Sequence, residues 1–273
     1  MSEQADLEGY LDHIGYAGPQ AATREALDGL IQAHTRRIPF ENLNPLLGWP
    51  VRLDLASLAR KFVREGRGGF CYEHNLWFAH VLRSFGFPVT GLAARVVWRQ
   101  PDDAVTPRTH MLLCVDVRGE RRLADVGFGA FTVTSSLALD AEGPQPSPHE
   151  SFRVVPAGRE YLMQVELDDS WRSLYRFDLQ PQEPVDYELT SWYLCHHPQS
   201  HFRQHLIAAR AEPGVRLGLL DGQLSVRRTG LPAERTELRD AGSLRQALKT
   251  HFFLDLPADP AVDARLEGLL RPG

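Results

Sequence analysis

The chain has 273 residues, which is enough for two domains or three small ones rather than one compact core. Its hydrophobic fraction of 43% and charged fraction of 24% are typical of a globular protein in water. A net charge of −5 argues against nucleic-acid and anionic-membrane partners, and no apolar run approaches the ~18 residues of a membrane span.

Helical patterns dominate the first third of the chain. Thr23 is a candidate N-cap, and Pro39 ends the helix that it begins. The residues at helical spacing in this segment are Leu27, Leu30, Ile31 and His34. Asp54 is a candidate cap for a second helix. The predicted inner face of that helix comprises Leu55, Leu58, Phe62 and Val63.

A third helix is predicted to begin at about Cys71 and to end at residues 86–88. A charged, glycine-rich turn over residues 67–69 precedes it. The start of a helix offers unpaired N–H groups and the positive end of the helix dipole, and both favour thiolate over thiol. Because the thiolate is the reactive form, Cys71 is a candidate nucleophile. Free cysteines are also often small buried hydrophobes, so position alone leaves both interpretations open.

After Pro88 the pattern changes to short strands. Residues 89–98 are β-rich, and a turn at 118–120 joins two further apolar runs, 111–117 and 123–126. Further short strands are predicted around residues 152–155, 161–167 and 171–179. This pattern indicates an antiparallel sheet or a small barrel.

The C-terminal part mixes both types of element. A short helix is expected over residues 185–194, and Asp221-Gly222 indicates a hairpin between strands at 215–220 and 224–228. Ser243 is the expected N-cap of a helix that runs to Phe252, and a last helix covers 263–270. Helices followed by strands and then a mixed segment indicate an α+β protein.

The cysteine count and the N-terminus bear on the compartment. Cys71, Cys114 and Cys195 are an odd number at wide spacing, which does not suit a disulfide framework or, without a CxxC pair, a structural zinc site. No positive segment followed by an apolar run begins the chain, so a cytoplasmic location with free thiols is expected.

A cysteine nucleophile needs a base and a group that orients the base. His110 stands directly before one strand of the hairpin, and Asp125 ends the other. Pairing about a centre near residue 118 places His110 opposite roughly residue 126, good to a residue or two. A carboxylate there could hold the imidazole tautomer. Alone, each residue is more often a loop or turn residue, but together beside Cys71 they indicate a catalytic triad.

Six segments in order give the chain a resemblance to the arylamine N-acetyltransferase family. They are residues 38–43 (IPFENL), 67–75 (RGGFCYEHN), 94–96 (ARV), 109–113 (THMLL), 125–129 (DVGFG), and Tyr193 with 197–202 (HPQSHF). The resemblance spans roughly residues 8–250 and is looser in the C-terminal third. It implies an N-terminal helical bundle carrying the nucleophile (1–86), a β-barrel carrying the base and acid (87–190) and an α/β lid (191–273).

The resemblance also implies a chemistry. The triad Cys71–His110–Asp125, like that of transglutaminases and papain-type proteases, would carry an acetyl group from acetyl-CoA to arylamines, hydrazines or N-hydroxyarylamines by a ping-pong route. Acetyl-CoA would be a co-substrate, with no tightly bound cofactor. The Cys71 backbone N–H is the expected oxyanion donor. A homodimer is compatible with this family assignment.

Further roles come from the same resemblance. The residues expected to approach CoA are Gly127, Phe128, Gly129 and Thr109. The residues expected to line the acceptor cleft are Phe40, Phe70, Val96 and Phe202, although large apolar residues are commonly core residues. Arg67 and Glu41 are expected to form a buried ion pair beneath the site.

Rival interpretations use the same residues. A transglutaminase-like cysteine hydrolase would pass the acyl group to water, and an amide synthase would use an internal amine. A binding module that kept the fold is a third alternative. A metal site is not expected, because neither His74 beside Cys71 nor the histidines at 196, 197, 201 and 205 have a ligand set at fitting spacing.

Overall fold

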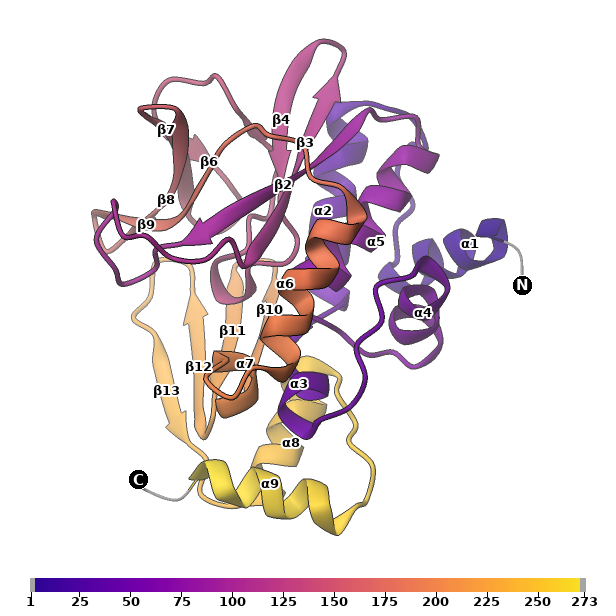
Figure 1. Cartoon of the computed structure of the whole chain (residues 1–273), viewed down its shortest axis with the longest axis vertical. Coiled ribbons are helices and arrows are strands. Elements are labelled where there is room, and N and C mark those ends of the chain that lie inside the picture. Colours follow the sequence, from indigo (N-terminus) through magenta and orange to yellow (C-terminus); the bar gives the residue numbers. More distant parts are fainter. Residues whose placement is uncertain (1–2, 271–273) are drawn as a thin grey trace.

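A computed structural model describes residues 3–270 and shows a helical part, a curled sheet, and a second sheet with helices beneath it (Figure 1). The predicted helical bundle (1–86) and α/β lid (191–273) include residues 1–2 and 271–273, which lie outside the described residues. The helical part consists of α1 (Glu3–Ile14), α2 (Arg24–Arg37), β1 (Phe40–Glu41), α3 (Leu43–Leu47), α4 (Leu55–Ala59), a π-helical turn (Arg60–Arg64) and α5 (Cys71–Ser84).

Side-chain caps begin two of these helices as predicted. The Thr23 hydroxyl accepts from the Ala26 N–H at 3.2 Å, and the Asp54 carboxylate accepts from the Ser57 N–H at 2.9 Å. The prediction that Leu55 lies on an inner face is wrong, because its side chain is 40% exposed. A regular α-helical period would put Leu55 on the same face as Phe62, whereas the π-helical turn after α4 changes the phase at which later residues meet the core.

The curled sheet is antiparallel, with strand order β5-β4-β3-β2-β9-β8-β7-β6. Its strands are β2 (Val89–Val96), β3 (His110–Val117), β4 (Glu120–Ala124), β5 (Leu137–Ala138), β6 (Gln145–Pro146), β7 (Ser151–Ala157), β8 (Glu160–Leu167) and β9 (Ser170–Phe177). The two ends of the sheet meet, since the Gln145 amide donates to the Ala138 carbonyl at 2.9 Å and accepts from its N–H at 2.7 Å. The predicted barrel is thereby confirmed as a nearly closed one.

Strand β3 joins two cores through its alternation. Met111, Leu113 and Val115 belong to the core that α2 and α5 share, whereas Leu112 belongs to the barrel interior. The barrel therefore packs one wall against the helix that Cys71 begins. This contact places the start of β3 near the start of α5.

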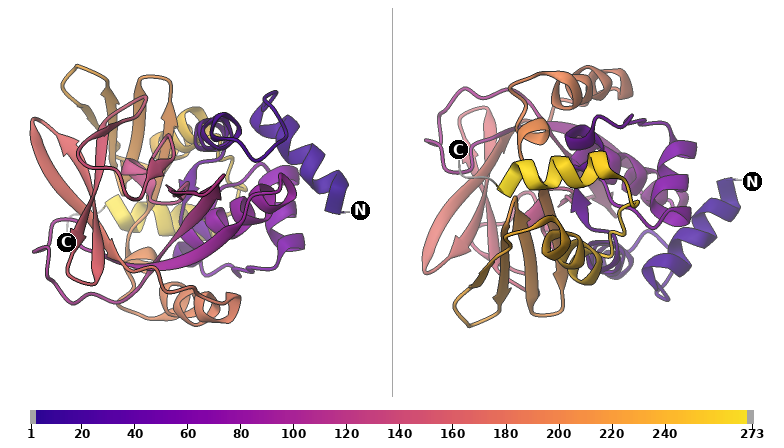
Figure 2. Two further views of the ribbon diagram at one scale, coloured as in Figure 1. Left: turned by 90° about the horizontal axis from the view of Figure 1, so that it is seen from above. Right: turned by 90° about the horizontal axis from the view of Figure 1, so that it is seen from below.

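The second sheet has the order β1-β10-β11-β12-β13, so a two-residue strand from the helical part completes it. The other strands are β10 (Ile207–Glu212), β11 (Val215–Leu220), β12 (Gln223–Arg228) and β13 (Glu234–Glu237). The accompanying helices are α6 (Pro184–His196), α7 (His201–Gln204), α8 (Ala241–Phe252) and α9 (Pro260–Leu270). Seen from below, α9 crosses the base of the molecule (Figure 2).

The cap of α8 differs from the prediction. Asp240 is the N-cap and accepts from the Ser243 N–H at 2.7 Å, while Ser243 occupies the third helical position. Both side chains suit a cap, and the helix takes the earlier one because Ala241 then enters the buried face. The predicted Asp221-Gly222 hairpin is confirmed by the Leu220–Gln223 pair. No helix within residues 3–270 is long and apolar enough to cross a bilayer.

Candidate active site

Cys71 is the first residue of α5 and is only 3% exposed. The turn before it passes very close to the helical part: a Cβ added at Gly68 would lie 1.8 Å from the Pro39 carbonyl oxygen. Only glycine fits that approach. The Cys71 Sγ lies 3.6 Å from the Thr109 carbonyl oxygen, next to the first residue of β3.

His110 and Asp125 lie together across the β3–β4 hairpin. The His110 Nε2 is 2.7 Å from an Asp125 carboxylate oxygen, and both side chains are buried. The observed pair Leu113–Ala124 sets a register that continues to place His110 opposite Gly127, one residue from the predicted partner position. Because Nε2 faces Asp125, the other ring nitrogen, Nδ1, is left for Cys71.

The electrostatics of this group favour a charged imidazole. Burial lowers the pKa of His110, but the charge and hydrogen bond of Asp125, with a smaller contribution from Cys71, outweigh it and raise that pKa to about 10. Burial likewise opposes ionisation of Asp125, yet His110 and the Gly127 N–H hold the Asp125 pKa below its usual range. The pair is therefore charged at neutral pH.

Asn75 connects α5, the helix that Cys71 begins, to Asp125 and to β3, the strand that His110 begins. Its amide nitrogen donates to the Met111 carbonyl at 2.8 Å and to Asp125 at 3.1 Å, and its oxygen accepts from the Val126 N–H at 3.2 Å. Sequence reasoning did not assign it a role. Its position, four residues after Cys71 on the same helical face, was the signal that could have identified it.

Tyr175 of β9 is a second residue that sequence reasoning missed. Its ring lies 4.9 Å from that of His110 and 5.0 Å from that of Phe128. Burial, and then the nearby Asp125 charge, raise the Tyr175 pKa well above its usual value, so the hydroxyl stays neutral. Nothing in the local sequence indicates this contact, because it arises from the pairing of β9 with β2.

The four residues expected to approach CoA lie around Cys71, His110 and Asp125. A Cβ at Gly127 would lie 2.8 Å from the Cys71 Cα, so this glycine lets the segment after β4 rest on the start of α5. The Phe128 ring lies 5.0 Å from that of His110. Gly129 has a φ of +81° and opens a 3-10 turn, Gly129–Phe131, called η2 below. Thr109 contributes the carbonyl beside Cys71.

Three of the four residues expected to line an acceptor cleft lie together. Phe202 contacts both Phe40 and Phe70, with ring centres 6.1 and 5.3 Å apart. Phe70 is fully buried, Phe40 is 9% exposed and Phe202 is half-buried. Val96 lies on the barrel side instead, paired with Tyr175 at the end of β2.

Beneath the turn lies a group of four charged side chains. An Arg67 Nη2 is 2.6 Å from Glu41, as the sequence led us to expect, and Lys61 is 2.6 Å from Glu73 and 3.8 Å from Glu41. Burial raises the Glu41 pKa, but Arg67 and Lys61 together lower it below its usual value. For Glu73 burial dominates and raises the pKa. Two cations thus face two carboxyl groups under the turn that presents Cys71.

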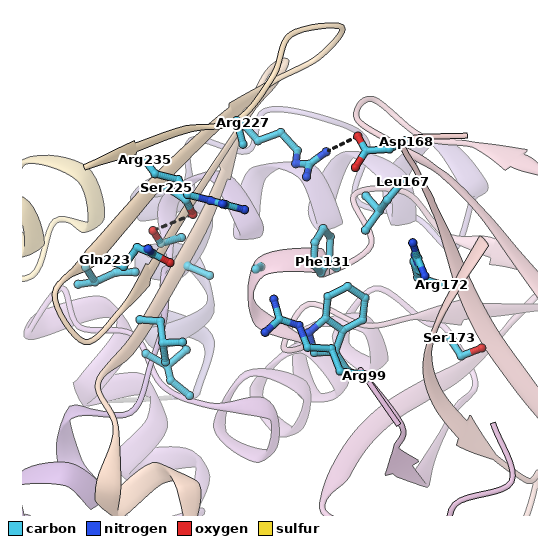
Figure 3. A pocket seen from close by; sticks show the side chains of 18 of the residues that line it. Arg99, Phe131, Leu167, Asp168, Arg172, Ser173, Gln223, Ser225, Arg227 and Arg235 are labelled. Carbon is cyan, nitrogen blue, oxygen red and sulfur yellow. Dashed lines mark hydrogen bonds and ion pairs between the residues drawn. The ribbon is translucent and has the colours of Figure 1, made fainter. Parts of the chain in front are cut away.

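A cavity of about 790 Å³ opens between the barrel and the second sheet (Figure 3). Ala130 and Phe131 of η2 belong to its wall, so it begins where the segment after Asp125 ends, although Cys71 does not line it. Arginines reach it from both sides, namely Arg99, Arg172, Arg227 and Arg235. This cavity has the size and charge to hold a large anionic ligand.

The histidines near residue 200 contact different partners, except His201 and His205, whose rings lie 4.6 Å apart. His197 stacks on Tyr193, and His205 is 2.7 Å from Asp221. Within the described part of the chain, no group of three or more His, Cys, Asp and Glu side chains is arranged to hold a metal ion.

Comparison with known proteins gives one consistent result. A family model described as N-acetyltransferase matches residues 23–261. The chain is 39% identical to the arylamine N-acetyltransferase of Mycobacterium tuberculosis (strain H37Rv), over 98% of each chain. It is 40% identical to a Salmonella typhimurium protein named arylamine N-acetyltransferase / N-hydroxyarylamine O-acetyltransferase, over 85% of this chain and 83% of that one.

Solved structures agree with these relatives. The arylamine N-acetyltransferase of Mycobacterium marinum superimposes with a TM-score of 0.93 at 38% identity, covering 97% of this chain and all of that one. Its complex with CoA superimposes with a TM-score of 0.92 at 37% identity, covering 96% of this chain and 99% of the other.

Proposed function

Because this chain belongs to the arylamine N-acetyltransferase family and is an acyltransferase, we propose that it moves acetyl groups from acetyl-CoA to aromatic amines through Cys71. The observation that carries the proposal is the buried arrangement in which Cys71 begins α5 while His110 faces it, held 2.7 Å from Asp125. The names of the relatives support the substrate class.

In the first half-reaction the Cys71 thiolate attacks the carbonyl carbon of the acetyl thioester. The bond between that carbon and the CoA sulfur breaks, and the protonated His110 gives its proton to the departing CoA thiolate. Acetyl-Cys71, free CoA and neutral His110 result. The Cys71 N–H, at the first position of α5, is directed to the developing oxyanion.

In the second half-reaction an amine nitrogen attacks acetyl-Cys71. Neutral His110 takes the proton from that nitrogen, the carbon–sulfur bond breaks, and the Cys71 thiolate and protonated His110 are restored. Asp125 stays ionised throughout and holds the imidazole orientation. An N-hydroxyarylamine oxygen reacts in the same way, which accounts for O-acetylation by the same site.

The acceptor side is apolar. Phe40, Phe70 and Phe202 form one edge-to-face cluster beside the turn that carries Cys71. Such a surface favours flat aromatic acceptors and excludes water, which would otherwise hydrolyse the acetyl-cysteine. This is the feature that favours transfer to an amine over the hydrolase alternative.

The donor side is charged. We assign the nucleotide part of CoA to the cavity shown in Figure 3, where Arg99, Arg172 and Arg235 can meet its phosphates. The wall at η2 then leads the pantetheine arm toward Phe128 and His110. Gly129, with its positive φ, permits close backbone approach there.

Intact-protein mass spectrometry with acetyl-CoA and no acceptor tests the proposal. We expect one added acetyl group on Cys71, removed on addition of an arylamine with release of its N-acetyl product. The Cys71→Ala variant should gain none, whereas the control Cys114→Ala, at a half-buried thiol on the far part of β3, should behave as the unaltered protein.

Two other outcomes identify the rivals. If the acetyl group is lost to water as fast as to the arylamine, the protein is a hydrolase. If acetyl-CoA never acylates Cys71 but a longer acyl donor carrying its own aromatic amine is cyclised, it is an amide synthase.

A further inference from the structure

The outer face of α6 is apolar, and nothing in the described chain covers it. Val185, Leu189 and Trp192 are 59%, 73% and 64% exposed. Their spacing of four and three residues puts them on one stripe of the helix. The opposite face is buried, with Tyr187 and Leu194 packed into the core around α5.

This concentration is unusual for the molecule. Nine large apolar side chains are exposed within residues 3–270, and four of them lie on this one helix. The fourth is Tyr193, beside the stripe. Single exposed apolar residues are normal, but a contiguous patch marks an interaction surface.

The helix also stands out from the body of the molecule. In both views of Figure 2, α6 lies at the periphery, with the rest of the chain to one side of it. A projecting helix can meet another helix without a clash between the bodies that carry them. A projecting helix therefore suits a partner that also presents a projecting helix.

Charges along α6 indicate what the partner is. Its first half carries the acidic residues Glu183, Asp186 and Glu188. Its end carries His196, whose carbonyl accepts from the Arg203 guanidinium at 3.0 Å. An antiparallel second copy of α6 would bring the acidic half of each helix toward the end of the other, where Arg203 of α7 supplies a positive charge, and would oppose the two helix dipoles.

We propose that α6 forms a two-fold interface with a second copy of this chain, centred on Leu189. About that axis, Leu189 meets the partner's Leu189, and Val185 meets the partner's Tyr193. The interface is isologous, since one stripe is complementary to itself. One helix face is smaller than the ~800 Å² per partner of a standard interface, so the dimer is weak and its population rises with concentration.

The dimer would also bear on the site. On the inner side of α6, Tyr187 lies with its ring 5.4 Å from that of Tyr72, the neighbour of Cys71. A partner on the outer face therefore restrains the helix that packs against Tyr72.

Sedimentation velocity over a range of concentrations tests the interface. The unaltered chain should shift reversibly from monomer to dimer, whereas Leu189→Arg, which puts two like charges together on the axis, should stay monomeric. Val105→Arg is the matched control: Val105 is 88% exposed on a loop, and its substitution should leave the dimer intact. Both sites are exposed, so thermal unfolding should be unchanged.

A cysteine on a two-fold axis can form a disulfide with its own copy. Mild oxidation should convert Leu189→Cys to a covalent dimer faster than Leu231→Cys, a control whose parent residue is 59% exposed elsewhere. A chain that stays monomeric at every concentration, a Leu189→Arg variant that still dimerises, or equal cross-linking of the two cysteine variants would each overturn the proposal. None of these measurements depends on catalysis, so they stand apart from the proposed function.

Discussion

Asn75 shows how much of the triad's geometry depends on one uncharged side chain. Its three hydrogen bonds reach β3, Asp125 and the segment after β4, so it fixes the distance between the helix that Cys71 begins and the hairpin that carries His110. All of these groups are buried. A residue that satisfies three buried partners cannot be shortened without leaving some of them unpaired.

Replacing Asn75 with Ala should lower the free energy of unfolding by about 1–3 kcal/mol and slow acetylation of Cys71, because buried groups on two elements lose their partners. Asn75→Asp should be slower still, since it sets a second carboxylate against Asp125. Urea unfolding and rapid-quench mass spectrometry measure the two effects. An Asn75→Asp variant with an unaltered acetylation rate would contradict this role.

The raised pKa of His110 predicts the pH dependence of the nucleophile. With a pKa of about 10, His110 is protonated across the neutral range, so alkylation of Cys71 by iodoacetamide should not follow the ordinary histidine pKa near 6.5. The Asp125→Asn variant lacks the largest contribution that raises the His110 pKa. In that variant the pH at which the rate of Cys71 alkylation changes should therefore move down toward neutral. The same transition in both proteins would show that Asp125 does not control it.

The sequence was sufficient to bring Cys71, His110 and Asp125 together and insufficient to predict what surrounds them. Cys71, His110 and Asp125 could be related because a helix start and a tight hairpin are local features. Tyr175 could not be related to them, because it approaches His110 only when β9 pairs with β2. The paired residues of these two strands lie about eighty positions apart in the chain. Val96 was grouped with Phe40, Phe70 and Phe202, which in the structure come together from three different segments, whereas Val96 ends β2.

At the scale of elements, a buried polar chain ties three helices together. The Tyr10 hydroxyl is 2.7 Å from one His34 nitrogen, the other is 2.7 Å from His74, and His74 is 3.2 Å from the Pro39 carbonyl. A carbonyl only accepts, so His74 must donate to Pro39 and accept from His34, which in turn accepts from Tyr10. The direction of every bond is fixed while both rings are neutral.

The hydrogen-bonded series Tyr10–His34–His74 predicts that the protein loses stability in mild acid. Burial lowers the pKa of His34 well below its usual value and that of His74 to about 4. As pH falls from about 6.5 toward 4, the unfolded chain takes up protons that the folded chain refuses, so the free energy of unfolding should decrease. His34→Phe should be less stable at pH 7.5 but should lose less between pH 7 and 5, as urea midpoints would show. A steeper loss in the variant would contradict the assignment.

Helix starts could be predicted where a side chain caps the helix from within a few residues. Thr23 and Asp54 cap helices because their side chains reach N–H groups within three residues. β1 could not be predicted, because two residues have no period, and its strand character comes from pairing with Ala208 and Ala209. The π-helical turn after α4 and the shifted cap of α8 likewise follow from packing rather than propensity.

At the scale of the whole molecule, Arg216 joins the second sheet to the barrel and to η2. Its Nε lies 2.6 Å from Glu150, and its Nη1 donates to the Thr132 carbonyl at 3.0 Å and to the Ala130 carbonyl at 3.3 Å. The guanidinium is buried between these parts. It therefore sets the position of the wall that we assign to CoA.

Arg216→Met should lower the free energy of unfolding by about 3–5 kcal/mol, because it leaves the Glu150 carboxylate, whose side chain is only 11% exposed, without its partner. It should also raise the KM for acetyl-CoA, since the carbonyls of Ala130 in η2 and of Thr132 directly after it lose a hydrogen bond each. Glu150→Gln keeps an acceptor for Arg216 and should be milder in both respects. If Arg216→Met changed stability but left the KM for acetyl-CoA unaltered, the hydrogen bonds from Arg216 to the η2 segment would not contribute to acetyl-CoA binding.

β1 has a consequence for the order in which the protein is made. Phe40 bridges Gly69, in the turn before the nucleophile, and also pairs with Ala209 of β10. During synthesis at ~5–20 residues per second, about 170 residues must follow Phe40 before its second partner exists. Through that interval Phe40 lies beside the turn that presents Cys71 without the strand that pairs with it in the folded protein, so this turn reaches its final packing only after β10 has been translated.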